Sequence, residues 1–275
     1  MCGRKQETRQ CALRGFWADT KVDPGDVVNV LADMEGGQFI VDDKKGLVVV
    51  NPDTLLSGTL VVSAVFCRRK SVLNEQFKGV DKGNVQMLYG SIIHSLFQEV
   101  LRDGVTQQKD VEALAVSKLK ASKFLHEMYG QNLVEGTVTE EVKQYIPTLM
   151  DWLGKHTLLH NTGRRQLKSE KRPEVMVTEI QDIEENIWSP RFGLKGKIDL
   201  TVQAELSKKD TGLEVKVVPL ELKTGKASFS SEHKGQVTLY SMMCSDRRTD
   251  PEEGILLYLK HGQMQRVPVK PESKS

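Results

Sequence analysis

Short apolar runs separated by turn-forming residues fill the chain up to about residue 64. The runs, rich in β-branched and aromatic residues, lie at residues 15–17, 26–31, 38–41 and 46–50. Clusters of Gly, Pro, Asp and Lys separate them, which is typical of strands joined by turns. We therefore predict an N-terminal module at residues 1–64. It is either an OB-like small β-barrel, a type that can bind single-stranded nucleic acid, or a structural cap packed on the next domain.

The middle of the chain shows the three-and-four spacing of amphipathic helices. It predicts helices at residues 84–101, 110–128 and 138–156. Gly104 follows the first of these and has the position of a C-cap. Thr137 and Glu140 have the form of a capping box at the start of the third, and Pro147 should kink or interrupt it.

Strand-like runs return after residue 173, beginning with residues 175–180. Two apolar runs then flank the polar, turn-forming residues 206–212, which predicts a hairpin. A helix at residues 232–244 and a strand at 253–259, ending in a short hairpin at His261, complete the pattern. The fold class is therefore α/β, with a mixed central sheet flanked by helices, and we assign residues 65–275 to this second domain.

The predicted hairpin brings two acidic residues together. A turn centred on Asp210 places Asp199 opposite Glu221, and alternation puts Glu221 and Lys223 on one face of the sheet. The apolar residues of the hairpin, Ile198, Leu200, Leu220 and Leu222, point to the other face. A one-residue slip of the register would move Asp199 to the wrong face.

Two opposed carboxylates repel each other unless a cation lies between them. Carboxylate and carbonyl oxygens suit Mg²⁺, which keeps several waters and takes further ligands from phosphates. A lysine on the same face, Lys223, can orient or activate the attacking water. The alternative is a surface hairpin with ordinary charged residues.

Four short motifs occur in a fixed order along the chain. They are Gly90-x-x-x-His94, Gly196-x-x-Asp199, Glu221-x-Lys223 and Gln236-x-x-x-Tyr240. Together they resemble the RecB-like branch of the PD-(D/E)xK nucleases. Within that branch, the chain, including the segment from Val61 to Phe77, resembles most the nuclease domains of eukaryotic replication helicase/nucleases. The resemblance implies a restriction-endonuclease-like fold for residues 65–275.

The resemblance also implies roles for individual residues. The catalytic residues would be Asp199, Glu221 and Lys223. Mg²⁺, with Mn²⁺ as a substitute, would be held by His94, Asp199, Glu221 and the Leu222 carbonyl. DNA would be bound and oriented by Gln236 and Tyr240. Glu179, on the preceding strand, would add a carboxylate. Without the other motifs, the alternative for Gln236 and Tyr240 is a half-buried helix with the tyrosine in the core.

The chain has four cysteines, Cys2, Cys11, Cys67 and Cys244, at no paired metal spacing. Their small number argues against a disulfide scaffold. By resemblance, Cys67 is the first of four ligands to a [4Fe–4S] cluster, and the other three lie downstream of the nuclease core. No cysteine follows Cys244, so those three ligands are absent from this chain. We interpret the chain as a C-terminally truncated or alternative form.

The charge of the whole chain does not indicate a nucleic-acid binder, because 39 basic residues nearly balance 37 acidic ones, leaving a net charge of +2. A phosphate-binding surface must therefore be local. Candidates are a basic helix face at Lys118, Lys120 and Lys123 and a basic loop at residues 160–173, each of which has a merely solvated alternative. No run suits a bilayer and no secretory signal is evident, so we expect no membrane partner.

These observations give one leading hypothesis and two alternatives. The leading hypothesis is a Mg²⁺-dependent phosphodiesterase that cuts single-stranded or flap DNA in replication and repair, including Okazaki fragment processing and end resection. By resemblance, its partners include a single-strand-binding protein, and it acts in the nucleus and also the mitochondrion. No Gly-x-x-x-x-Gly-Lys-Ser/Thr loop occurs, so no ATPase motor is predicted. The alternatives are a fragment that binds single-stranded DNA without cutting and a docking module.

Overall fold

The computed structural model describes residues 7–79, 83–158, 173–208, 212–247 and 251–269. Its centre is a six-stranded sheet in the order β11-β10-β9-β8-β6, with β7 paired to β8. Its strands are β6 (Leu56–Ser57), β7 (Val175–Ser189), β8 (Leu194–Lys208), β9 (Gly212–Lys223), β10 (Glu253–Tyr258) and β11 (Gln263–Pro268). Antiparallel β8–β9 and parallel β9–β10 pairs make the sheet mixed, which confirms the predicted class.

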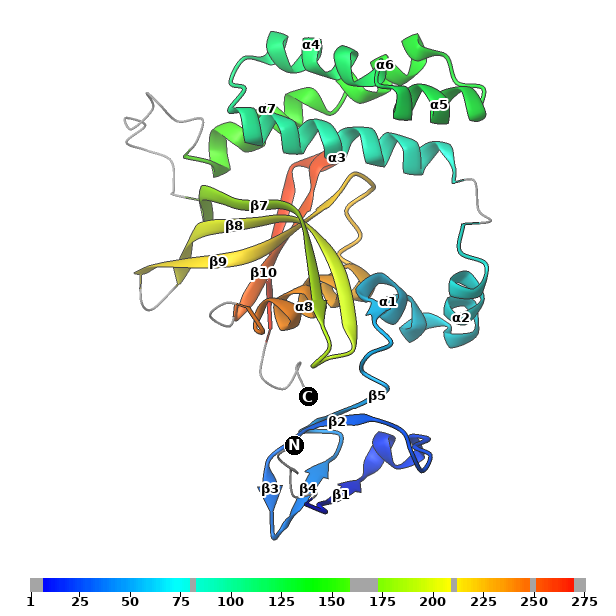
Figure 1. Cartoon of the computed structure of the whole chain (residues 1–275). Helices are drawn as coiled ribbons and strands as arrows, with labels where there is room; N and C mark the ends of the chain where they lie inside the picture. The colour runs from blue at the N-terminus through cyan, green and yellow to red at the C-terminus, as the bar shows by residue number, and fades with distance from the viewer. Residues whose placement is uncertain (1–6, 80–82, 159–172, 209–211, 248–250, 270–275) are drawn as a thin grey trace, which may run out of the picture.

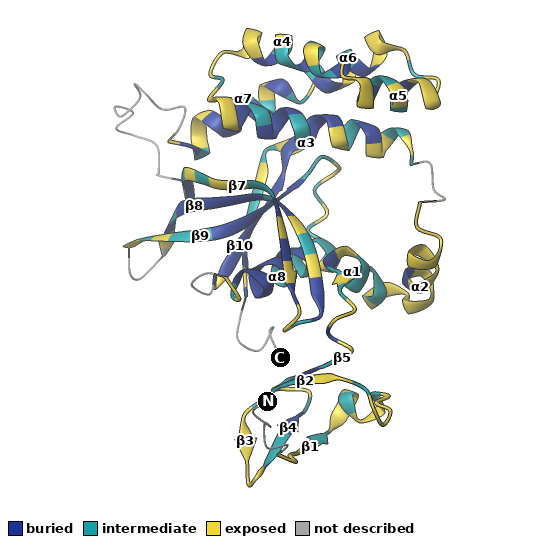
Figure 2. Cartoon of the chain, viewed as in Figure 1, coloured by how far each residue is buried: buried dark blue, intermediate teal, exposed yellow. Residues whose placement is uncertain are grey.

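Helices cover the central sheet on two sides (Figure 1). The helices α3 to α7 form one layer, and α8 (Ser231–Cys244) lies against the opposite face with α1 (Gly58–Phe66) beside it. Successive side chains of β10 point to opposite faces of the sheet, so this strand packs against both helix layers. Ile255 and Leu257 enter the core under α3 to α7, whereas Leu256 and Tyr258 pack with α8. β10 is accordingly buried along its whole length, whereas β7 and the start of β9 carry intermediate and exposed positions (Figure 2).

The N-terminal strands do not form the predicted barrel. β1 (Gln10–Leu13), β3 (Met34–Glu35) and β4 (Gln38–Val41) make one small sheet, and β2 (Val28–Leu31) with β5 (Leu47–Val50) makes another. Strands of two to four residues are too short to close around a core, and within them the buried apolar side chains are Ile40, Val41 and Val48. The run at residues 15–17 is also not a strand, because Gly15–Asp19 is a 3₁₀ helix.

The segment after β5 joins the central sheet. β6 pairs in parallel with β8, and α1 follows directly, so the predicted domain boundary at residue 64 lies within this helix. α2 (Arg68–Gln76) continues from Cys67. The N-terminal sheets are tied to the β7–β8 connection, because the Asn29 amide donates to the Pro190 carbonyl at 3.0 Å.

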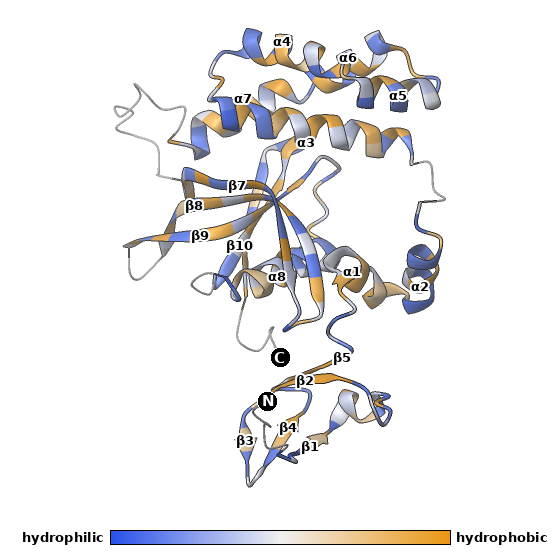
Figure 3. Ribbon diagram, viewed as in Figure 1, coloured by the Kyte–Doolittle hydropathy of each residue, from blue (hydrophilic) through white to orange (hydrophobic). Residues whose placement is uncertain are grey.

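The long helix α3 (Val85–Asp103) confirms the first helix prediction. The Asn84 side chain caps its start by accepting from the Met87 N–H at 3.0 Å. Gly104 ends it with φ of 63°, a left-handed conformation that favours glycine. Figure 3 shows how apolar and polar positions alternate around this helix.

The next two predicted helices are each broken in two. The first break separates α4 (Gln108–Leu119) from α5 (Ser122–Gly130), because Ala121 takes extended backbone and thereby lets both Leu119 and Phe124 enter the core. The second separates α6 (Glu135–Lys143) from α7 (Ile146–His156). Pro147 lies in the first turn of α7, as its missing N–H permits, so the predicted interruption is confirmed.

The predicted capping box at Thr137 is wrong. α6 begins at Glu135 after Val134, which makes no side-chain cap, and Thr137 lies inside the helix. Among the described helices, none combines the length and apolar content that crossing a membrane requires.

Candidate active site

Asp199 lies where β8 separates from β9. The last strand pair before this point joins Leu200 to Leu220, which is the predicted register, although the turn around Asp210 lies outside the described residues. The next positions along the two strands are Asp199 and Glu221. One Asp199 carboxylate oxygen accepts a hydrogen bond from the Leu222 N–H at 2.8 Å. The Asp199 side chain thus accepts the hydrogen bond of a main-chain N–H that has no strand partner in β8, at the point where the β8–β9 pairing ends.

The apolar face of the hairpin differs from the prediction at one residue. Leu200, Leu220 and Leu222 join the core under α3 to α7 as expected. Ile198 instead packs in the cluster that contains Tyr240 of α8. β8 leaves β9 at Asp199 and curves toward α8 and α1, so strict alternation no longer assigns one face to both sides of that point (Figure 1).

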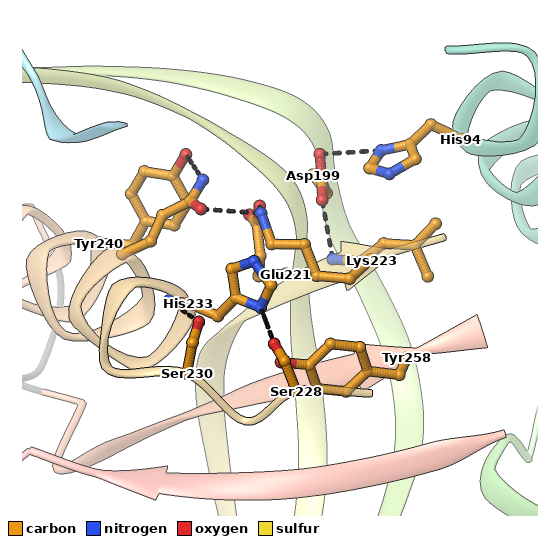
Figure 4. A network of polar contacts seen from close by, with 11 residues as sticks. His94, Asp199, Glu221, Lys223, Ser228, Ser230, His233, Tyr240 and Tyr258 are labelled. Atoms are coloured by element: carbon orange, nitrogen blue, oxygen red, sulfur yellow. Dashed lines mark hydrogen bonds and ion pairs between the residues drawn. The ribbon is translucent and has the colours of Figure 1, made fainter. Parts of the chain in front are cut away.

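His94 reaches the same site from α3, one turn after Gly90. Its Nδ1 atom lies 3.3 Å from Asp199 Oδ1 (Figure 4). Burial disfavours the charged imidazolium, but the bond to Asp199 and that carboxylate's charge outweigh it and raise the His94 pKa. A Cβ at Gly90 would lie 3.5 Å from the Thr224 hydroxyl, an ordinary contact distance, so packing alone does not require glycine there. The structure therefore brings the histidine motif to the Asp199 carboxylate.

The Glu221 carboxyl group is buried, and its two oxygens differ in their hydrogen bonding. Its Oε1 accepts from the Lys223 ammonium at 2.8 Å, whereas its Oε2 is buried and has no hydrogen-bond partner within the described part of the chain. Burial, and then the charge of Asp199, raise the pKa of Glu221 to about 8. A buried polar atom without a partner costs free energy, so this oxygen is placed to receive a ligand.

The donor set fits a hard divalent cation. Two carboxylates, one of them with the orphaned Glu221 oxygen, lie beside the Leu222 peptide and the His94 imidazole. Within the described ranges, however, no three His, Cys, Asp or Glu side chains converge in a metal-binding group. The Leu222 carbonyl as a ligand, and the full Mg²⁺ set, stay predictions.

Gln236 and Tyr240 are buried and act within the protein. The Gln236 carbonyl oxygen accepts from Lys223 at 2.8 Å, and its amide donates to the Tyr240 hydroxyl at 2.8 Å. Their exposed fractions are 6% and 3%, so little of either side chain reaches solvent, and Gln236 holds Lys223 while Tyr240 also lines a small hollow beside α1. Burial also raises the pKa of Tyr240, which keeps the phenol neutral. The predicted DNA contacts of this pair stay predictions.

Glu179 does not come near the two carboxylates. It is exposed and pairs with Gln203 across β7 and β8, four positions away from Asp199. The acidic residue of β7 that reaches the site is Glu184, which accepts a hydrogen bond from Gln98 of α3. Two register shifts in β7, after Val177 and after Ile180, change which residues face the site. Alternation alone could not have found Glu184.

A cleft of about 890 Å³ opens beside these residues, between α3, the α4–α5 turn and the sheet. His94, Lys223 and Glu184 line it, together with Lys118 and Lys123. Lys118 is paired with Glu99 and donates to Ser95 at 2.8 Å, which leaves Lys123 the more open cation. Two lysines of the predicted basic face thus border the site, while the basic loop at 160–173 lies outside the described residues except for its last position.

Two further residues adjoin Lys223 that sequence reasoning missed. His233 Nδ1 lies 2.7 Å from the Tyr258 hydroxyl, and Tyr258 pairs with Lys223 across β9 and β10. Burial and the nearby Lys223 charge lower the His233 pKa. Figure 4 shows the His233 ring directed toward Tyr258. The position of His233 three residues before Gln236 was a usable signal, because both share a helix face. Tyr258 carries no such signal, since only the parallel β9–β10 pairing places it there.

Cys67 does not lie in a cluster site. It is exposed, and its sulfur caps α2 by accepting from the Lys70 N–H at 3.4 Å. Of the other described cysteines, Cys11 is in β1 and Cys244 is buried in α8. A [4Fe–4S] cluster needs several thiolates, so the described residues do not fit one.

Gly196 is required by close packing, which gives a testable prediction. A Cβ at this position would lie 2.6 Å from Met243 Cε and 2.8 Å from Tyr240 Cε1. Gly196→Ala should therefore lower the free energy of unfolding by about 1–3 kcal/mol through overpacking. Urea denaturation measures this. The control Gly136→Ala lies in α6 with open space around it and should stabilise the chain by about 0.5–1 kcal/mol. Equal behaviour of the two variants would contradict the packing argument.

Comparison with known proteins identifies the family. Residues 2–204 match the family described as DNA replication factor Dna2. The chain is 40% identical over 270 residues to the human DNA replication ATP-dependent helicase/nuclease DNA2, covering 94% of this chain and 25% of that protein. The chicken protein of the same name is 39% identical over 269 residues, which cover 95% of this chain and 27% of that protein. The Schizosaccharomyces pombe protein of this name is 32% identical over 264 residues, which cover 94% of this chain and 18% of that protein. The chain thus spans about a quarter or less of the length of these relatives, and it belongs to the Dna2 family.

Proposed function

We propose that this chain is a metal-dependent DNA nuclease that acts on single-stranded or flap DNA and serves DNA replication. The observation that supports it most is the group formed by Asp199, Glu221 and Lys223. Two carboxylates on neighbouring strands meet a lysine ammonium beside an open cleft, and one buried carboxylate oxygen has no hydrogen-bond partner among the residues that the structure describes. The names of the relatives, which describe helicase/nucleases of DNA replication, agree with this proposal.

The chain's own residues have separable tasks in phosphodiester hydrolysis. Asp199 and Glu221, with His94 and the Leu222 carbonyl, would hold Mg²⁺, with Mn²⁺ as a substitute. When bound, the ion supports the negative charge that builds on the phosphate oxygens. Lys223 would orient the attacking water, since its ammonium is fixed between Glu221 and Gln236.

Gln236 and Tyr240 are then positioning residues in this mechanism. The Gln236 amide is fixed by the hydrogen bond that it donates to the Tyr240 hydroxyl, and the Gln236 carbonyl oxygen fixes the Lys223 ammonium by accepting from it. Holding a lysine in one rotamer removes the entropy cost of orienting it in the transition state. His94 similarly holds Asp199 from the side of α3.

A cleavage assay with three DNA substrates tests the proposal. The chain is incubated with end-labelled single-stranded, 5′-flap and fully paired DNA, with Mg²⁺, with Mn²⁺ or with EDTA. We expect cutting of the single-stranded and flap substrates that requires the added metal, and little cutting of the duplex. Salt-dependent binding without any cleavage would overturn the proposal and favour a DNA-binding fragment. Absence of both would favour a docking module.

The wider setting is part of the same proposal. A nuclease for flaps works at replication forks and resected ends, so we place the chain with a single-strand-binding protein, in the nucleus and also in the mitochondrion. The relatives' helicase function is not extended to this chain, because its sequence has no Walker A phosphate loop.

A further inference from the structure

The far end of the β7–β8 ribbon exposes an aromatic ring between two lysines. Trp188 pairs with Lys195, and Asn186 pairs with Lys197, so side chains of these four residues share one face of the ribbon. That face is open to solvent, while the neighbours Ile187 and Ser189 are buried on the other (Figure 2). Trp188 itself is 66% exposed. The ribbon therefore gains no core packing from the largest side chain that it carries.

The lysines beside Trp188 differ in how free they are. Lys197 is paired with Glu184, which lines the cleft of the candidate active site. Lys195 is exposed, and its side chain makes no ion pair or hydrogen bond with any described residue. A positive charge without a partner next to an open aromatic ring is complementary to a phosphate and its base.

A hollow of about 350 Å³ lies against this face. Trp188, Lys195 and Lys197 line it on the ribbon side, and Ser57 and Thr59 at the start of α1 line the other. It joins the candidate active site in two ways, because Lys197 also lines the cleft and Tyr240 also lines the hollow. An extended ligand that passes over Lys197 would thus contact both.

We propose that single-stranded DNA crosses the β7–β8 ribbon on its way to the cleft, with one base stacked on Trp188 and the adjoining phosphate beside Lys195. This inference rests on the proposed function and names the path of its substrate. Stacking on an aromatic ring needs an unpaired base, so the surface discriminates single strands from duplex DNA without reading their sequence. A stable protein–protein interface instead buries about 1,200–2,000 Å² in total, which one ring between lysines does not supply.

Binding measurements without metal test this inference separately from cleavage. Fluorescence anisotropy of a labelled oligothymidylate, in EDTA, gives the affinity of the parent, Trp188→Ala, Trp188→Phe and Lys195→Ala. We expect Trp188→Ala to weaken binding by about 5- to 100-fold and Trp188→Phe to retain most of the affinity, because the ring still stacks. Lys195→Ala should weaken binding less and flatten its dependence on salt.

A matched control is available on α1. Phe66 is 65% exposed, like Trp188, but lies at the opposite end of the helix from the hollow, so Phe66→Ala should bind as the parent does. Thermal melting of each variant verifies folding, which an exposed side chain should hardly affect. Unchanged affinity of Trp188→Ala overturns the inference and points to a protein contact at Trp188. That result would leave the proposed function standing if the parent still cuts DNA with Mg²⁺.

Discussion

Asp199→Asn is expected to reduce Mg²⁺-dependent cleavage of single-stranded DNA by at least about 1,000-fold, because stabilisation by a bound metal is worth several kcal/mol. Asparagine keeps the size of the side chain. It also keeps an oxygen that can accept the hydrogen bond from the Leu222 N–H, which in the parent chain spans 2.8 Å. It removes the negative charge that a cation needs and weakens the pairing with His94. The fold should survive while the chemistry fails, and a single-turnover cleavage rate measures the loss.

Lys223→Ala is the companion experiment in the same assay. A general acid or base typically raises the rate of the chemical step by about 10²- to 10⁴-fold. We therefore expect the cleavage rate at saturating DNA to fall by a factor in this range. DNA affinity should change little by comparison. Lys120→Ala is the matched control, because Lys120 is exposed on the α4–α5 turn and does not line the cleft. If Asp199→Asn and Lys223→Ala both cut as fast as the parent, the assigned roles are wrong.

The second large effect concerns stability as a function of pH. The Glu221 pKa rises from its ordinary value of 4.5 to about 8 in the folded chain. Below pH 4.5 both states carry the proton, and the contribution of this group to stability is complete. Between these values the unfolded chain loses a proton that the folded chain keeps, so without metal the free energy of unfolding falls as pH rises. The loss is on the order of 4 kcal/mol by pH 9.

Glu221→Gln isolates this effect, because the amide resembles the protonated acid and cannot ionise. Urea denaturation in EDTA from pH 5 to pH 9 should show a much smaller fall for the variant than for the parent. Mg²⁺ should act in the opposite direction, since it binds the ionised carboxylate. The rise in melting temperature on adding Mg²⁺ should therefore grow toward pH 8 in the parent and be nearly absent in Glu221→Gln. Identical pH profiles of parent and variant would contradict the assigned burial.

Sequence reasoning was strongest where the decisive contacts are close along the chain. The register that sets Asp199 beside Glu221 followed from one turn and a two-residue period, and α3 followed from its apolar spacing and Gly104. Sequence reasoning failed where the structure depends on contacts between distant segments. The N-terminal strands were predicted to form a barrel because alternation does not reveal how little core they bury. Residues 110–128 were predicted to form one helix because the break at Ala121 serves tertiary packing.

The sequence by itself determined which residue types meet on neighbouring strands, because hairpin register and side-chain alternation are local properties of the backbone. Only the tertiary structure decided that His94 approaches Asp199 from α3, that Gln236 and Tyr240 are buried and hold Lys223, and that Glu184 rather than Glu179 borders the cleft. The tertiary structure alone also showed that Glu221 Oε2 is buried without a hydrogen-bond partner in the described ranges. The physical reason is that burial, and with it the pKa of a carboxyl group, depends on segments distant in sequence that pack around it.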